Sequence, residues 1–371
     1  MEPNQFGISL VTREGEVFSA GDAHVEFSIQ SISKVFALAL VLSNDGDGIW
    51  KRVFREPSGN PFNSLVQLES ENGIPRNPFI NAGAIVVTDR LLSLTGNAAG
   101  AVRELMRRES GNASVDTDHR VAASELGRGH RNASLAHFLA SCGNLENPVD
   151  DVLESYAQQC ALSMSCEDLA LAARFLASNG LGADGTLVLS PAQTKRVNAV
   201  MLTCGTYDAA GEFAYRVGLP GKSGVGGGIV AVVPNKCAIS VWSPGLGRSG
   251  NSVAGVAALD EFTTRTGWSV FQDAVCDAAL PSVTGCVRAF EACYGAALQF
   301  FHGNTGHLPH RAAPSRPPGA GCGRRARRGT PRQGTARRRR ESYGGRSRCL
   351  RKTPRPGGFR AARLGAPRVP H

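Results

Sequence analysis

Strand-forming segments stand at both ends of the first 270 residues, and a long helical stretch separates them. Near the start, residues 6–12 and 15–20 are rich in β-forming residues and predict a hairpin. Near the end, strands are predicted over 212–217, 228–233 and 237–242. Because strands and helices are segregated along the chain, an α+β fold is favoured over a doubly wound one. We expect a mainly antiparallel sheet assembled from both ends of the chain, with a helical insertion packed at one end of it.

The helices of the central stretch are delimited by residues that suit helix ends. An apolar run, Val35–Leu42, predicts a buried central helix with Ser28 as its N-cap, because the run has no polar face. Serine caps, prolines in first turns and glycines after helix ends mark the other helices. These are predicted over 82–94, 165–177, 190–204 and 252–266. The expected place for a functional site is the cleft between the sheet and this helical block.

The composition changes sharply near residue 271. Residues 1–270 carry 21 Lys and Arg against 27 Asp and Glu, a net charge of −6, whereas residues 271–371 carry 20 against 4, a net charge of +16. The second part is dominated by Arg, Pro, Gly and Ala, which cannot bury enough apolar surface to offset chain entropy. We therefore expect a globular domain over residues 1–271, and a disordered basic tail over residues 272–371.

Two interpretations of this tail are open. Its charge would let it bind nucleic acid or an anionic membrane without sequence preference. The interpretation that we favour is an inert tail, or the product of out-of-frame translation. Because residues 1–270 are mildly acidic, a nucleic-acid-binding surface is not expected there. Any nucleic acid would bind through the tail alone.

The ten cysteines are scattered and show no C-x-x-C spacing, which indicates buried thiols in a reducing compartment. No cluster of His and Cys has the spacing of a zinc site, so no metal is expected. The longest apolar run of the globular part is too short to cross a bilayer, and no basic-then-apolar leader opens the chain. We therefore expect a cytoplasmic protein that is not bound to a membrane.

The motif Ser31-Ile32-Ser33-Lys34 begins the predicted buried helix. A spacing of three places Ser31 and Lys34 on one helical face, within hydrogen-bond reach of each other. A serine hydroxyl is a poor nucleophile until a base takes its proton, and lysine serves as that base when burial keeps it neutral. On its own the motif is equally compatible with a capping serine and a solvent-exposed lysine.

A second motif, Lys222-Ser223-Gly224, precedes the strand predicted from Gly228. Serine acyl-transfer enzymes of the penicillin-recognising type pair S-x-x-K with a K-[ST]-G box on a strand beside the site. The small residues of this box let a substrate approach backbone N–H donors closely. A glycine-rich strand entry with a surface lysine would explain the second motif alone. Together, in this order, the two motifs favour an acyl-serine enzyme.

Longer runs of the sequence resemble those of the serine-dependent glutaminases, from near Asn4 to about Phe271. The resemblance is carried by FSIQSISKVFAL, EPSGNPFN, NPFINAGAIVVT, GHRNASLA, YDAAGEFAYRVGLPGKSGVGGGI, VVPN and GNSVAG. Members of that family have a β-lactamase-like fold, form homodimers or homotetramers, and hydrolyse L-glutamine to L-glutamate and ammonia without a cofactor. The resemblance implies the same fold, substrate, reaction and assembly here.

The resemblance also implies roles for individual residues. Ser31 would be the nucleophile and Lys34 its base. The substrate-binding positions would be Ser31, Asn81, Glu125, Asn132, Tyr156, Tyr207 and Val225, supported by Lys222, Ser223 and Gly224. A carboxylate such as Glu125 suits the α-ammonium of glutamine, and Asn and Tyr donors suit its α-carboxylate.

The chemistry of amide cleavage gives further roles to four of these residues. The backbone N–H groups of Ser31 and Val225 are the expected oxyanion donors. Tyr207 is expected to relay a proton to the departing ammonia, with Lys222 favouring the ionised form of the phenol.

Family members carry a further tyrosine in a Tyr-Ile-Pro-type segment that would precede residue 1. Two alternatives to a glutaminase stay open, and only the first of them rests on this tyrosine. One is a catalytically impaired, glutamine-binding remnant that lacks this tyrosine. The other is a related serine hydrolase acting on β-lactams or peptides, for which Glu125 would have no α-ammonium to pair with.

Overall fold

The computed structural model describes residue 2, residues 4–272 and Gly295. Residues 4–272 belong to one compact unit. Of the predicted basic tail, residues 272–371, all but Gln272 and Gly295 lies outside the described residues, as does its predicted disorder.

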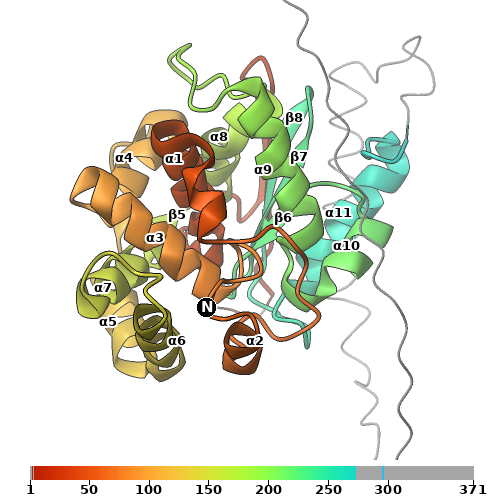
Figure 1. The fold of residues 1–371 in the computed structure, drawn as a ribbon. Coiled ribbons are helices and arrows are strands. Elements are labelled where there is room, and N and C mark those ends of the chain that lie inside the picture. Colours follow the sequence, from red (N-terminus) through yellow and green to blue (C-terminus); the bar gives the residue numbers. More distant parts are fainter. Residues whose placement is uncertain (1, 3, 273–294, 296–371) are drawn as a thin grey trace, which may run out of the picture. The chain divides into compact units, whose positions relative to one another are not determined.

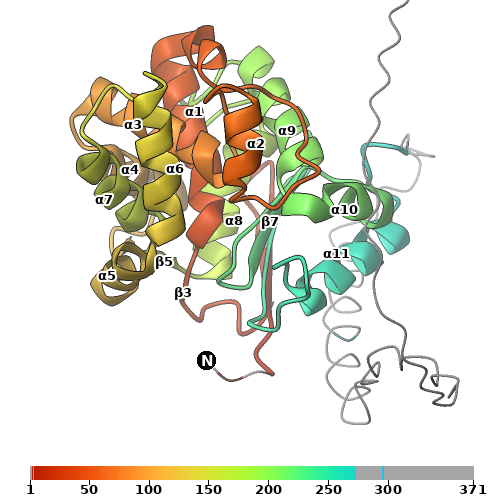
Figure 2. The same cartoon turned by 60° about the horizontal axis from the view of Figure 1, so that its bottom comes forward.

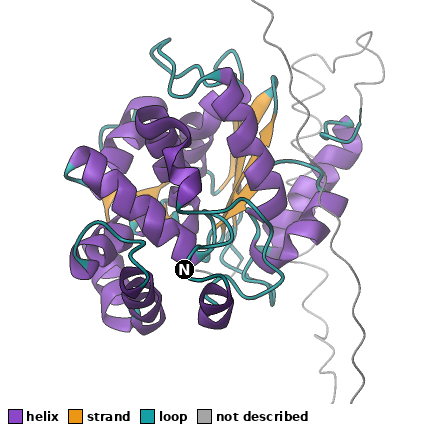
Figure 3. Ribbon diagram, viewed as in Figure 1, coloured by secondary structure: helices purple, strands orange, loops and turns teal. Residues whose placement is uncertain are grey.

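A five-stranded antiparallel sheet is assembled from both ends of the described chain (Figures 1 and 3). Its order is β2-β1-β8-β7-β6, and β1 pairs with β8 from Gly7 opposite Trp242 to Thr12 opposite Cys237. The strands are β1 (Gly7–Thr12), β2 (Val17–Gly21), β6 (Gly221–Ser223), β7 (Gly228–Val233) and β8 (Cys237–Trp242). The predicted sheet is confirmed, since its central pair joins an N-terminal to a C-terminal strand.

The strand predicted over residues 212–217 is wrong, because this segment lies in helix α10 (Ala210–Arg216). Its alternation of polar and apolar residues suits a strand, but the two side chains that reach the core are Phe213 and Val217. A spacing of four places them on one helical face. The edge strand instead begins at Gly221 and carries the K-S-G box.

Within the described residues, nine of the ten helices that lie between the two groups of strands along the chain form a single block. They are α1 (Ser33–Asp45), α2 (Leu65–Ser70), α3 (Asn81–Thr95), α4 (Ala98–Ser110), α5 (His119–Arg128), α6 (His130–Ser141), α7 (Val149–Cys160), α8 (Cys166–Ala177) and α9 (Pro191–Cys204). A small second sheet, β3 (Phe27–Ser28), β5 (Leu162–Met164) and β4 (Asp116–Thr117), lies among them.

Each face of the large sheet is covered by a separate hydrophobic core. Side chains of β7 alternate between the faces, so that Val230 and Val232 join the core of the helical block, whereas Ile229 and Ala231 join a smaller core. Helix α8 packs on the first face, and α11 (Val253–Thr266) packs on the second (Figure 2). The sheet thus has the helical block on one side and α10 and α11 on the other.

The predicted serine caps hold except at the helix that follows the S-x-x-K motif. Ser165, Ser190 and Ser252 each accept a hydrogen bond from a backbone N–H in the first turn of their helix. Ser28 is not an N-cap, because it lies in β3 and its hydroxyl donates to the carbonyl of Cys160 at 3.0 Å. A 3-10 turn, Gln30–Ile32, separates β3 from α1 and carries the serine of interest.

Candidate active site

Ser31 lies in the 3-10 turn that leads into α1, where 8% of its surface is exposed. The loop after β6 packs closely against the backbone at and just before this turn. A Cβ atom on Gly224 would lie 2.5 Å from the carbonyl oxygen of Ile29, and one on Gly226 would lie 2.2 Å from that of Ser28. Only glycine fits such a close approach of two backbones. The S-x-x-K and K-S-G motifs are therefore brought together on one side of the molecule.

Lys34 is buried in the first turn of α1, with 1% of its surface exposed. Its Nζ atom donates to the carbonyl oxygen of Phe79 at 3.1 Å and to Oδ1 of Asn81 at 2.7 Å. Burial lowers the pKa of this amine to about 8, against an opposing effect of Cys160 and Glu125. A neutral amine has two N–H groups and one lone pair. The two acceptors match both N–H groups, which leaves the lone pair for a proton from a neighbour.

Asn77 is a supporting residue that the sequence analysis did not single out. It is buried, and its Oδ1 accepts from the backbone N–H groups of Phe79 and Ile80, each at 3.0 Å. Its Nδ2 donates to the carbonyl of Glu56 at 2.9 Å. Asn77 thus fixes the peptide whose carbonyl receives Lys34. The Asn-Pro dipeptide at Asn77 is a turn signal that could have drawn attention to it.

Asn81 connects the lysine to the helical wall of the site. It is the first residue of α3, and its Oδ1 accepts from both Lys34 and the hydroxyl of Tyr156, the latter at 3.4 Å. Its Nδ2 donates to Oδ1 of Asn132 at 2.9 Å. Residues from α1, α3, α6 and α7 are therefore joined in one network. The structure brings together four of the predicted site residues here.

Glu125 and Asn132 lie beside this network in an open cavity of about 320 Å³. Its lining is polar and carries both signs of charge: Asn63, Asn81, Ser124, Glu125, Arg128, Gly129, Arg131 and Asn132. Nε2 of Gln30, the residue before the predicted nucleophile, lies 3.5 Å from Oε1 of Glu125. The carboxylate therefore contacts a residue of the same 3-10 turn that carries Ser31. Such a cavity suits a small zwitterion.

Tyr207 closes the site from the side of the sheet. Its hydroxyl donates to the carbonyl of Ser223 at 3.3 Å, and its oxygen also hydrogen-bonds with the side chain of Ser31 and the backbone N–H of Val225. Burial raises the pKa of this phenol to about 12, so it stays protonated at neutral pH. The N–H of Val225, predicted as an oxyanion donor, and the hydroxyl of Ser31 thus both reach the oxygen of Tyr207.

Lys222 is also fully buried, with Nζ 4.6 Å from the centre of the Tyr207 ring and 2.5 Å from the carbonyl of Ser223. Burial lowers the pKa of this amine well below its usual value. Burial favours the neutral phenol of Tyr207 and the neutral amine of Lys222. This geometry therefore speaks against the prediction that a charged Lys222 favours an ionised Tyr207. Lys222 instead supports the carbonyl that receives the Tyr207 hydroxyl.

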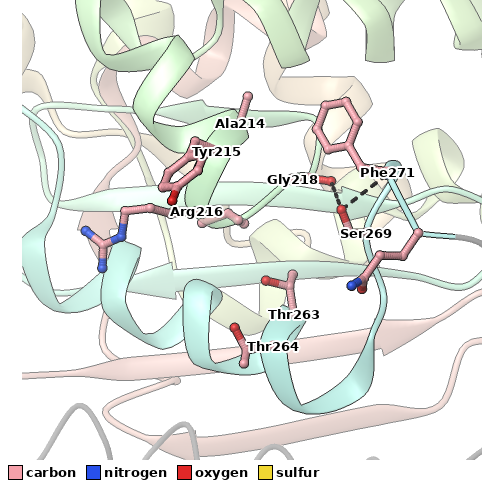
Figure 4. Close-up of a pocket in the computed structure, with 10 residues that line it drawn as sticks. Ala214, Tyr215, Arg216, Gly218, Thr263, Thr264, Ser269 and Phe271 are labelled. Carbon is pink, nitrogen blue, oxygen red and sulfur yellow. Dashed lines mark hydrogen bonds between the residues drawn. The ribbon is translucent and has the colours of Figure 1, made fainter.

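A second hollow, of about 200 Å³, lies between α10 and α11 (Figure 4). Tyr215 and Phe271 border it, and the hydroxyl of Ser269 donates there to the carbonyl of Gly218 at 3.0 Å. None of the predicted site residues lines it. Within residues 4–272, no group of three His, Cys, Asp or Glu side chains is placed to hold a metal ion. No helix in the described part of the chain is long and apolar enough to span a membrane.

Comparison with known proteins gives one consistent family. The Glutaminase family model matches residues 1–271. The glutaminase of Streptomyces coelicolor is 63% identical over 270 residues, 73% of this chain and 88% of that protein. The crystal structure of a probable glutaminase from Bacillus subtilis is 35% identical, with a TM-score of 0.69 over 72% of this chain and 90% of that one. The structure of Mglu in its glutamate form is 35% identical, with a TM-score of 0.69 over 73% and 63%.

These likenesses confirm the resemblance that the sequence motifs predicted, and with it the β-lactamase-like α+β fold. The match covers the strands from both ends of the described chain, the helical block and every predicted site residue. The chain belongs to the glutaminase family.

Proposed function

We propose that this protein hydrolyses L-glutamine to L-glutamate and ammonia through an acyl-serine intermediate on Ser31. The observation that carries the proposal is the buried amine of Lys34, whose pKa is about 8. Its two N–H groups have acceptors in Phe79 and Asn81, so the lone pair of its neutral form is free to accept a proton. The relatives named above as glutaminases support the choice of substrate. Mglu, a structural relative, was crystallised in its glutamate form, which is the product of this reaction.

In the proposed first step, Lys34 takes the proton of the Ser31 hydroxyl while its oxygen attacks the side-chain amide carbon of glutamine. Negative charge then grows on the amide oxygen. The backbone N–H groups of Ser31 and Val225 would stabilise it, each contributing about 2.7–4 kcal/mol. Tyr207, a neutral phenol, would give its proton to the amide nitrogen as the C–N bond breaks, and Lys34 would return the serine's proton to Tyr207. Ammonia leaves, and the acyl group stays on Ser31.

In the second step, water attacks the acyl-serine ester, with Lys34 again accepting the proton. Glutamate is released when the bond to the Ser31 oxygen breaks, and the proton returns to that oxygen. The cycle needs no electron transfer, since only acyl groups and protons move. The direct test is to measure ammonia release from L-glutamine by the purified protein. Absence of turnover at any glutamine concentration would contradict the proposal, and a stable covalent adduct with penicillin would favour a β-lactam-directed hydrolase.

We expect the rate to rise with pH through the pKa of Lys34. Below about pH 8 the amine is an ammonium ion without a lone pair, so it cannot accept the proton of Ser31. The profile of kcat/KM for L-glutamine should therefore climb between about pH 6 and pH 9, with its midpoint near pH 8, and then level off. Steady-state assays in a constant-ionic-strength buffer series would measure it. A profile that is flat or falling over this interval would rule out Lys34 as the base.

We propose that Glu125 pairs with the α-ammonium of the substrate, while Asn132 and Tyr156 donate to its α-carboxylate. Glu125→Gln removes the charge and keeps the shape of the side chain. We expect KM for L-glutamine to rise about 10-fold to 100-fold, with kcat changed less than about 3-fold, because the lost charge-assisted contact acts on binding. Glu154→Gln, exposed on α7, is the matched control and should leave both constants unchanged. A fall in kcat at constant KM would contradict this role.

We also propose that residues 1–271 form the catalytic domain, which the span of the family match supports. Assembly into a homodimer or homotetramer, residence in the cytoplasm and binding of nucleic acid by the basic tail stay predictions.

A further inference from the structure

Two residues of the site hold a backbone conformation that their side chains disfavour. Five described residues other than glycine have positive φ, and three of them are asparagines, which tolerate the left-handed region. The other two are Gln30, at +50°, and Tyr207, at +59°. A left-handed residue of this kind is strained and persists only where its surroundings hold it. Something must therefore hold Tyr207 with its hydroxyl toward Ser31.

The side chain of Asn251 is placed to do this. Its Nδ2 donates to the carbonyl oxygen of Thr206 at 3.2 Å, and that oxygen also receives the backbone N–H of Ala209 at 3.2 Å. The Thr206 carbonyl belongs to the planar peptide whose rotation sets φ of Tyr207. A donor on this oxygen therefore restrains the torsion angle that aims the phenol.

Asn251 is itself firmly held. Only 5% of its surface is exposed, and its Nδ2 also donates to the hydroxyl of Ser249 at 3.1 Å. Its Oδ1 has no hydrogen-bond partner within the described part of the chain, so this side chain makes hydrogen bonds only as a donor, through Nδ2. The next residue, Ser252, caps α11 and donates to the carbonyl of Ser243. The amide is thus anchored to a helix that packs on the sheet.

We infer that Asn251 is a positioning residue, which acts on the reaction by fixing the peptide before Tyr207. The inference rests on the proposed function, in which Tyr207 protonates the departing nitrogen. Asn251 touches neither Ser31 nor the substrate cavity. If it acts through Tyr207, its loss should harm the cleavage of substrates whose leaving group needs a proton, and spare substrates whose leaving group departs as a stable anion.

The test compares L-glutamine with the γ-(4-nitrophenyl) ester of L-glutamate in the full-length protein. Asn251→Asp replaces the donor by an acceptor of the same shape, and Asn251→Ala removes it without adding charge. We expect either variant to lower kcat/KM on glutamine about 10-fold to 100-fold, a partial loss of the roughly 100-fold to 10,000-fold that a general acid contributes, and to lower it on the ester less than about 3-fold. Tyr207→Phe should give the same pattern. In the double variants the losses should not multiply, because both changes disable one step.

Asn198→Asp is the matched control. Asn198 is equally buried in α9 and also donates to a backbone carbonyl, that of Leu176 at 3.0 Å, but it lies outside the site. This control should lower the melting temperature without separating the two substrates. Equal losses on amide and ester, or multiplying losses in the double variants, would overturn the inference. A wild-type protein that leaves glutamine intact would instead overturn the proposed function.

Discussion

Ser31→Ala is expected to lower kcat for L-glutamine by about 10⁵-fold to 10⁶-fold, the loss seen when a catalytic serine is removed from an acyl-transfer site. The substitution removes the oxygen that forms the acyl bond, and the remaining groups can only orient a water molecule. The turn itself should persist, because its backbone is fixed by the hydrogen bond from Ile32 N–H to the Ile29 carbonyl and by the glycines packed against it. Ammonia release and thermal melting would be measured on the same preparation.

Ser33→Ala provides the comparison two residues away. The hydroxyl of Ser33 is also buried, but it donates to the carbonyl of Gln30 at 2.9 Å and lies 3.8 Å from the sulfur of Cys160. Its loss should reduce stability by about 1 kcal/mol and leave kcat within about 10-fold of the original. If Ser31→Ala retains full turnover while Ser33→Ala is inactive, the nucleophile has been assigned to the wrong serine.

Gly226→Ala is expected to be the second most damaging change. Its new methyl carbon would lie 2.2 Å from the carbonyl oxygen of Ser28, a rigid backbone atom, so the loop after β6 must move away from the catalytic turn. That movement displaces the adjacent N–H of Val225, the proposed oxyanion donor. Loss of one such donor lowers kcat about 100-fold to 1000-fold, and the displaced loop should also lower the melting temperature.

Gly211→Ala is the control for this prediction. Gly211 lies in α10, where an added Cβ meets open space and the helix gains an alanine. Its activity should match that of the original protein, and its stability should be equal or slightly higher. Activity of Gly226→Ala within about 3-fold of the original, together with a lowered melting temperature that reports the displaced loop, would remove Val225 from the role of oxyanion donor.

Local signals in the sequence predict much of this fold. The serine caps at Ser165 and Ser190, each with a capping box, predict the first residue of two helices correctly. Four strands of the large sheet, β1, β2, β7 and β8, are equally clear, but the edge strand β6 was not predicted. The segment around Phe213 is ambiguous, since spacings of two and four both fit its apolar residues. Only the core against which it packs decides between strand and helix.

The site is harder to predict, because its chemistry depends on contacts between distant segments. Motifs and resemblance identify Ser31 and Lys34, but no local pattern shows that Lys34 is buried against the carbonyl of Phe79. The lowered pKa of that amine follows from this burial. Likewise, no residue preference predicts a left-handed Tyr207, because the conformation is imposed by neighbours such as Asn251. The Asn-Pro dipeptide marks a turn at Asn77, but it does not show that this side chain fixes the peptide whose carbonyl accepts from Lys34.

The pairing of β1 with β8 bears on how the enzyme comes into being during synthesis. The turn that carries Ser31 leaves the ribosome early. The loop after β6 and strand β8, which pairs with β1, follow only after the whole helical block has been made. Contacts between such distant segments form slowly, because a long loop must close before they are gained. Partly made or partly folded chains therefore hold a serine and a lysine but no pocket. Catalytic competence should arrive with the last strand, in one step.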